Sequence, residues 1–366
     1  MAAVFAGLTA TSHAQSSLGS GITGAREITP EMRRKIEVYG ENWAGRMADE
    51  SASTTQVEEA RDKLLRPLNA PGATLQFRRE MYEVIENPLK ELIERRDGIE
   101  RYPHRAVNAI RILQAARTKD GLTLLASHVD PAFDDRIFVR RRAIIGCETI
   151  MLDMINSGAA SEGAERRAID RVVRTIGDAT ISETDAMARR HGLGALAAIG
   201  NVDNVNKGDD VIEEIAANAR AKLLESFKGC LETLLSADEA PTVDDISAMH
   251  AAIIDFRDMF LLMQDDRKQR SIGRELGPLL ADALSVPVGH WEHLRSSRDA
   301  VAALDGLITD SEALLHTINN RLTSTGDNVT PASDALQAAW SSDRQSEFDR
   351  ALNAWSGVVS TSPYQR

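Results

Sequence analysis

One pattern of small and large apolar positions occurs three times between residues 101 and 200. The copies are residues 104–113, 141–150 and 190–199, and each begins with two basic side chains. In each copy a small residue is followed one, three and seven positions later by an aliphatic, a second small residue and another aliphatic. These spacings place the four side chains on one face of an α-helix, which predicts three helices that pack closely through small residues. The aligned residues are Ala106, Val107, Ala109 and Leu113; Ala143, Ile144, Gly146 and Ile150; and Gly192, Leu193, Ala195 and Ile199.

The copies are offset by 37 and 49 residues, close to the roughly 35 to 50 residues of one helix-turn-helix unit in an α-solenoid. The pattern resembles the first helix of a HEAT repeat. Arg105 and Arg142 occupy the position where that family often carries an inter-repeat arginine, and His191 replaces it in the third copy. Asp130-Pro131 resembles the family's Asp-Pro turn. The resemblance covers residues 91–214 and implies stacked helix pairs, with an irregular helical bundle as the alternative.

Helical spacing of apolar residues continues outside the copies, so we predict an all-α fold, a HEAT-like helical repeat array followed by an antiparallel helical bundle. Thr29 and Pro30 suit the N-cap and first position of the first helix. After the polar loop 201–208 the helices lengthen, including one from His290 to about Leu322, and the repeated pattern disappears. The predicted segments are HEAT-like repeats over 29–205, a long-helix bundle over 206–325 and a weakly helical Ala/Ser-rich tail over 326–366.

The first residues resemble a truncated signal peptide. The apolar run 2–10 precedes Ser12-His13-Ala14, which has small residues at positions −3 and −1 of a signal-peptidase site. We therefore predict that residues 1–14 are removed, that the Ser/Gly-rich segment 15–28 is a flexible leader, and that the protein is exported to the periplasm or beyond. The alternative is a disordered apolar tail on a cytoplasmic protein, because the basic n-region is missing.

Composition limits the kinds of partner. The 366 residues carry a net charge of −12 at pH 7, and an acidic surface repels phosphate backbones, so general nucleic-acid binding is not expected. No apolar run approaches the ~18 residues of a transmembrane helix. Cys147 and Cys230 lie on apolar helix faces and predict two buried thiols, with a disulfide as the alternative in an exported protein. The oligomeric state is not indicated.

Two glycine-containing segments imitate ligand-binding motifs. Residues 192–197 match a dinucleotide fingerprint, but that motif must follow a strand and open a helix, whereas this one lies inside a predicted helix. Residues 203–214 imitate a calcium loop, but Val205 and Lys207 stand where oxygen ligands are required. We therefore expect no cofactor and no metal.

One histidine pair raises the possibility of an enzyme. His290 and His293 share a predicted helix face with Glu292 nearby, yet zinc needs three or four converging ligands, and the sequence offers no further one. An enzyme with a pocket between array and bundle near these histidines is the alternative function.

The candidate binding site is a set of arginines on one predicted helix. A turn of 100° per residue places them within an arc of about 140°, opposite the apolar side chains of the same helix. In a HEAT-like pair this helix would line the concave surface, where guanidinium groups suit an anionic protein segment. Intrahelical pairs from Glu162 and Asp170 would instead make it a solvated face. The site residues are Arg166, Arg167, Arg171 and Arg174.

From these observations we predict a non-catalytic, exported helical-repeat scaffold that binds another protein through its concave helix face. A structural envelope protein without a discrete ligand is a further alternative.

Overall fold

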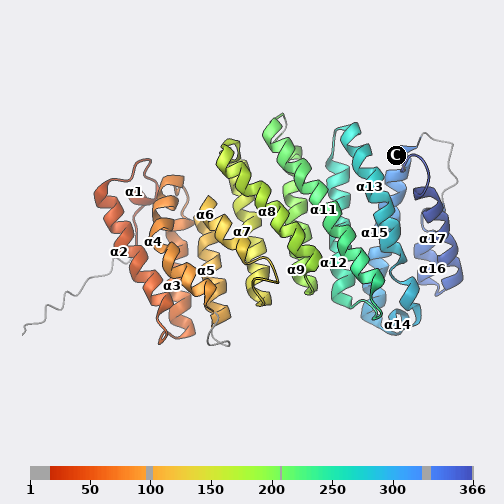
Figure 1. Ribbon diagram of the computed structural model, residues 1–366, viewed down its shortest axis with the longest axis horizontal. Helices are drawn as coiled ribbons and strands as arrows, with labels where there is room; N and C mark the ends of the chain where they lie inside the picture. Colours follow the sequence, from red (N-terminus) through yellow and green to blue (C-terminus); the bar gives the residue numbers. More distant parts are fainter. Residues whose placement is uncertain (1–16, 96–101, 207, 324–330, 365–366) are drawn as a thin grey trace, which may run out of the picture. The chain divides into compact units, whose positions relative to one another are not determined.

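The computed structural model describes residues 17–95, 102–206, 208–323 and 331–364, and throughout these residues it is all-α, without a strand (Figure 1). The predicted fold class is confirmed, with helices packed mainly on their neighbours in the sequence. The chain divides into two compact units, residues 1–124 and 125–366. The predicted signal peptide, residues 1–14, lies outside the described residues. Among the described residues no helix is long and apolar enough to cross a membrane.

Unit 1 is built from helix pairs. Its elements are α1 (Ser20–Thr23), α2 (Pro30–Ala48), α3 (Thr54–Leu68), α4 (Leu75–Glu94), α5 (Tyr102–Ala116) and α6 (Lys119–Ser127), which runs across the boundary between the units. Helix α2 packs on α3 and α4, and α5 packs on α3 and α4. The Thr29 side chain accepts a hydrogen bond from the Met32 amide and Pro30 opens α2, as the sequence predicted.

Part of the predicted flexible leader is held to this unit. The Thr74 amide donates to the Thr23 carbonyl at 2.9 Å, and the Thr74 hydroxyl donates to the Ala25 carbonyl at 2.7 Å. Thr74 also caps α4. Residues 20–25 are therefore fixed beside the start of α4.

Unit 2 consists of two layers of alternating helices. One layer holds α7 (Ile137–Asn156), α9 (Ala186–Gly200), α12 (Val243–Leu262) and α15 (Arg298–Leu322), each packed on the next. The second holds α8 (Gly163–Ser182), α11 (Asp210–Ser236), α13 (Asp266–Ser285) and α17 (Gln345–Val359), also packed in that order. We call them the α9 layer and the α11 layer. The remaining elements are η1 (Ala159–Ser161), α10 (Val202–Val205), η2 (Val288–His290), α14 (Trp291–Ser296) and α16 (Ala335–Ser341).

The repeated pattern forms the buried faces of α5, α7 and α9. Every aligned position is buried except Val107, which is half-buried. The small residues are where helices approach each other: a Cβ added to Gly192 would lie only 2.0 Å from the Thr180 hydroxyl of α8. A larger residue there would force the two helices apart.

The loop at 201–208 does not separate the helices on its two sides. Helix α11, which follows it, packs on both α8 and α9, which precede it. The alternation of two layers continues through α12, α13 and α15. The predicted segment boundaries at 205 and 325 remain predictions.

One local prediction was wrong. The helix expected from His290 to Leu322 is interrupted at Ser297, which caps α15 by accepting from the Ala300 amide. In the segment predicted as a weakly helical tail, α16 and α17 carry Trp340 and Trp355, which are both 0% exposed.

Candidate functional site

The predicted arginine site lies on α8, in the α11 layer. Ala168, Ile169, Val172, Val173 and Ile176 are buried against neighbouring helices, and the arginines point away from them, as the helical periodicity predicted. The structure separates the four by exposure. Arg166 is half-buried and forms an ion pair with Glu214 of α11, whereas Arg167, Arg171 and Arg174 are exposed.

Three of these arginines are uncompensated. The intrahelical pairs considered from the sequence, Glu162–Arg166 and Asp170–Arg174, are not among the ion pairs of the described residues. Asp170 instead accepts a hydrogen bond from the Asn218 amide of α11 at 3.3 Å. Arg167, Arg171 and Arg174 have no ion-pair partner within the described part of the chain. We call these three residues the arginine stripe; with a rise of 1.5 Å per residue it is about 10 Å long.

Ion pairs connect neighbouring helices of the α9 layer, some of them through the turn that precedes α9. Arg140 of α7 binds Glu183 through two hydrogen bonds of 2.7 Å, and Arg141 binds Asp185 at 2.7 and 2.6 Å. Arg189 of α9 pairs with Asp245 of α12. These arginines lie at or next to the basic pair that opens each copy of the repeated pattern. The arginine side chain beside Asp185 holds the pKa of that carboxyl below its usual range.

Further along the same layer, α12 and α15 are joined in the same manner. Arg257 Nη1 donates to Asp310 Oδ1 at 2.8 Å, and His250 Nε2 lies 2.7 Å from Asp310 Oδ2. Each carboxylate at these helix–helix junctions therefore meets a cation or a ring nitrogen from the neighbouring helix.

A groove of about 780 Å³ crosses the α9 layer over α7, α9 and α12. Its floor is formed by the small residues Gly194, Ala197, Ala198 and Ala251. The charged or polar lining residues are Glu148, Arg190, His191, Asn201, Asp255 and Asp258, and the larger apolar ones are Met187, Ile254 and Leu262. We call this the α9 groove.

The ionisable groups in the α9 groove are perturbed by burial. Burial raises the pKa of Glu148, and the charge of Asp255 adds to this effect. Burial also raises the pKa of Asp255, with Asp258 adding to the effect and Arg190 opposing it. Burial lowers the pKa of His191, and the charge of Arg190 acts in the same direction. In this partly desolvated hollow, burial thus shifts the pKa values of Glu148, Asp255 and His191 toward their neutral forms.

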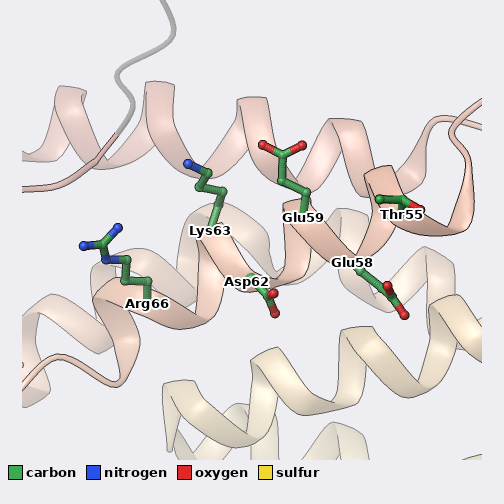
Figure 2. Close-up of a pocket in the computed structure, with 6 residues that line it drawn as sticks. All are labelled: Thr55, Glu58, Glu59, Asp62, Lys63 and Arg66. Atoms are coloured by element: carbon green, nitrogen blue, oxygen red, sulfur yellow. The ribbon is translucent and has the colours of Figure 1, made fainter.

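Two hollows in unit 1 do not bring together ionisable groups with shifted pKa values as the α9 groove does. One, of about 380 Å³, follows the exposed side of α3, and all six of its lining residues come from that helix. In Figure 2 Glu59 and Lys63 point to one side and Glu58 and Asp62 to the other. The second, of about 500 Å³, lies at the turn between α2 and α3 beside His104 and Arg105.

The residues predicted for the enzyme alternative do not line any of the hollows described above. His290 is half-exposed, and Glu292 and His293 are exposed. Among the described residues no three His, Cys, Asp or Glu side chains come close enough to hold a metal ion.

The cysteines do not form an activated nucleophile. Both are free and buried. Burial raises the pKa of the Cys147 thiol well above its usual range and that of Cys230 to about 11, so both are protonated at neutral pH. In the segment that imitates a calcium loop, the carboxylate of Asp203 accepts two hydrogen bonds from Arg220, at 2.8 and 3.0 Å.

Comparisons with known proteins assign no family. No family model matches the sequence, and no curated protein matches it. The chain is similar to an engineered protein whose crystal structure was determined by the Northeast Structural Genomics Consortium, with 13% identity over 91% of this chain and 97% of that chain. The TM-score is 0.19, and no statement about this chain rests on that likeness.

Proposed function

We propose that this protein is a non-catalytic, exported scaffold of HEAT-like helix pairs that binds a partner protein through the arginine stripe on α8. The observation that supports the proposal is the set of three exposed arginines without ion-pair partners among the described residues. Like charges three and four residues apart on a helix cost roughly 0.2–0.5 kcal/mol per pair. An anionic segment of a partner would remove that repulsion and accept paired hydrogen bonds from the guanidinium groups.

The proposed repeat character is supported by the way the helices alternate. The three copies of the pattern occupy α5, α7 and α9, and the two-layer packing continues beyond them to α15. Helix α8 follows α7 directly and takes the second position in its pair, where a HEAT-like protein binds its partner.

A charge-reversal experiment tests the proposal. Arg171→Glu with Arg174→Glu changes only exposed side chains, so the far-UV circular dichroism should not change. In affinity capture from the native source, with quantitative mass spectrometry, we expect the main partner to be recovered at least about tenfold less. This corresponds to about 1.4 kcal/mol of binding free energy.

A matched control is available in the same layer. Arg270 and Arg274 of α13 are also exposed, and Arg270→Glu with Arg274→Glu makes the same change in net charge. Equal losses from both double variants would mean a general effect of charge rather than binding at α8. Partner recovery that is indifferent to both variants and to added salt would contradict the proposal.

A further inference from the structure

The α9 groove holds two carboxylates that nothing in the described chain neutralises. Glu148 comes from α7 and Asp255 from α12, and α9 runs between them with Gly194 facing the groove. Neither carboxylate has a hydrogen-bond or ion-pair partner among the described residues. Asp258 also lines the groove, but it forms an ion pair with Arg257 at 3.3 Å. The cationic side chain of the lining is Arg190.

The same layer shows how such carboxylates are otherwise accommodated. Asp185 receives Arg141, Asp245 receives Arg189, and Asp310 receives Arg257. In each case the cation comes from the preceding helix. Glu148 and Asp255 line the α9 groove without an ion pair among the described residues, and Arg190 only partly offsets the charge of Asp255, so charge complementarity favours a positively charged group from outside the chain.

The rest of the groove suits a protein segment more than an isolated cation. The floor of glycine and alanine lets a backbone approach α9 closely. The lining residues of α9 run from Met187 to Asn201, which spans about 20 Å at 1.5 Å per residue. Leu262, which also lines the groove, is 59% exposed. An exposed leucine in the lining offers an apolar contact to a bound segment.

We propose that the α9 groove binds a protein segment that places a lysine or arginine side chain between Glu148 and Asp255 and an apolar side chain against Leu262. The site lies in the other layer from the arginine stripe and does not depend on it. The bound cation stabilises both carboxylates in their ionised form, which burial and mutual repulsion disfavour in the empty groove.

The test uses two peptides of about twelve residues with fluorescent labels. In one, lysine and leucine recur at helical spacing; in the other, glutamate replaces each lysine. Fluorescence anisotropy measures their binding to the full chain. We expect the lysine peptide to bind and the glutamate peptide not to bind.

Two variants address charge and shape separately. Glu148→Gln with Asp255→Asn removes the charges and keeps the volume. Gly194→Leu keeps the charges and fills the groove, since the nearest atom to an added Cβ is Asp255 Oδ2 at 3.8 Å. Each should weaken binding of the lysine peptide at least about tenfold. Neither should lower the melting temperature, because the first removes repulsion and the second replaces a glycine within a helix.

Matched controls separate this site from general attraction to an acidic protein. Gly357→Leu makes the same substitution on α17, where no atom lies within 4 Å of the added Cβ. Asp238→Asn with Glu239→Gln removes two exposed charges between α11 and α12. Both should leave the affinity unchanged.

Three results would overturn the inference: equal binding of the two peptides, affinity unchanged in both groove variants, or binding of spermine without binding of the lysine peptide. The last would identify a site for small polyamines. A failure of any kind here leaves the test of the arginine stripe unaffected, because that test changes α8 alone.

Discussion

Each unit has one buried arginine near the start of a copy of the repeated pattern, Arg105 in unit 1 and Arg140 in unit 2, and the two bind different kinds of partner. In unit 1, Arg105 donates to backbone carbonyls at the end of α2 and the turn after it, with the shortest bonds to Asp49 at 2.8 Å and Ala52 at 3.0 Å. In unit 2, Arg140 binds the carboxylate of Glu183 and also donates to the Asp134 carbonyl at 2.9 Å. Both arginines are buried, at 6% and 4% exposure.

The difference shows that two arginines at the start of the repeated pattern, two positions apart in the alignment, hold their helices by different electrostatic means. Carbonyls at the end of α2 carry the partial negative charge of a helix C-terminus, which a cation stabilises without needing a counter-ion. Glu183 is a buried carboxylate whose countercharge comes from Arg140, so removing the arginine leaves a buried charge without its partner. Junctions in unit 2 should therefore respond more to loss of the arginine and to acid than the α2–α3 turn.

The largest effect is expected from Arg140→Ala. Because it leaves Glu183 buried and unpaired, we expect a loss of about 3–5 kcal/mol in the free energy of unfolding. Chemical denaturation followed by the fluorescence of Trp291, Trp340 and Trp355 measures it. Arg140→Met with Glu183→Leu should lose much less, since it removes both charges and keeps apolar volume. A double variant as unstable as Arg140→Ala would show that packing, not the unpaired charge, accounts for the loss.

A smaller loss is expected from Arg105→Ala. The carbonyls that it leaves lie at the half-exposed α2–α3 turn and are uncharged, so water can hydrogen-bond to them in place of the guanidinium. We therefore expect a loss of only about 1–3 kcal/mol in the free energy of unfolding. Hydrogen exchange should quicken in residues 44–54 and remain unchanged in α7 to α9. A loss as large as that of Arg140→Ala would remove the distinction between the two junctions.

The smallest effect concerns pH. The pKa of Asp185 is lowered in the folded protein chiefly by its hydrogen bonds from Arg141, so the stability it contributes is present above the unfolded pKa of about 3.9 and is lost as the pH falls below it. Asp185→Asn retains a good N-cap for α9 and removes the charge. We expect it to cost about 0.5–1 kcal/mol at pH 7, and this cost to shrink progressively as the pH falls from the unfolded pKa through the lower folded one. Thermal melts over an acid series check it, and a cost that does not change between pH 7 and the most acidic pH at which the protein folds would contradict it.

The fold was predictable because its signals are local. Thr29 with Pro30, and Thr74, mark helix starts through hydrogen bonds within a single turn, and the small and aliphatic positions of the copies identify the buried faces of α5, α7 and α9. The interruption at Ser297 was missed because the apolar spacing of the two segments around it is nearly continuous. The Ala/Ser-rich composition of the tail gives no sign of how deeply its aromatic side chains are buried, because burial depends on α13 and α15; the buried ones are Trp340, Phe348, Trp355 and Tyr364.

The two candidate surfaces differ in how far the sequence could reveal them. The arginine stripe comes from one helix, so its periodicity was enough to place Arg167, Arg171 and Arg174 on one exposed side. Whether Glu162 and Asp170 form ion pairs with the arginines depends on side-chain rotamers and on contacts with α11, such as the hydrogen bond from Asn218 to Asp170, and neither can be read from the sequence. The α9 groove draws on three helices, and no local pattern links Glu148 to Asp255. Its one trace in the sequence was Gly194, which had been noticed only as part of a false dinucleotide motif.

The last two helices have a consequence for how copies of the chain meet. A layer of packed helices presents an apolar face at its final member, and such a face could be covered by the matching face of another molecule, adding chains without limit. Here α17 packs on α13 and α16 on α15, and the Glu312 carboxylate of α15 receives the backbone amides of Leu336 and Gln337 at 3.0 and 3.1 Å. Because those hydrogen bonds and the buried tryptophans hold the two helices in place, the faces of α13 and α15 that they cover are withheld from neighbouring molecules, in the manner of a capping repeat.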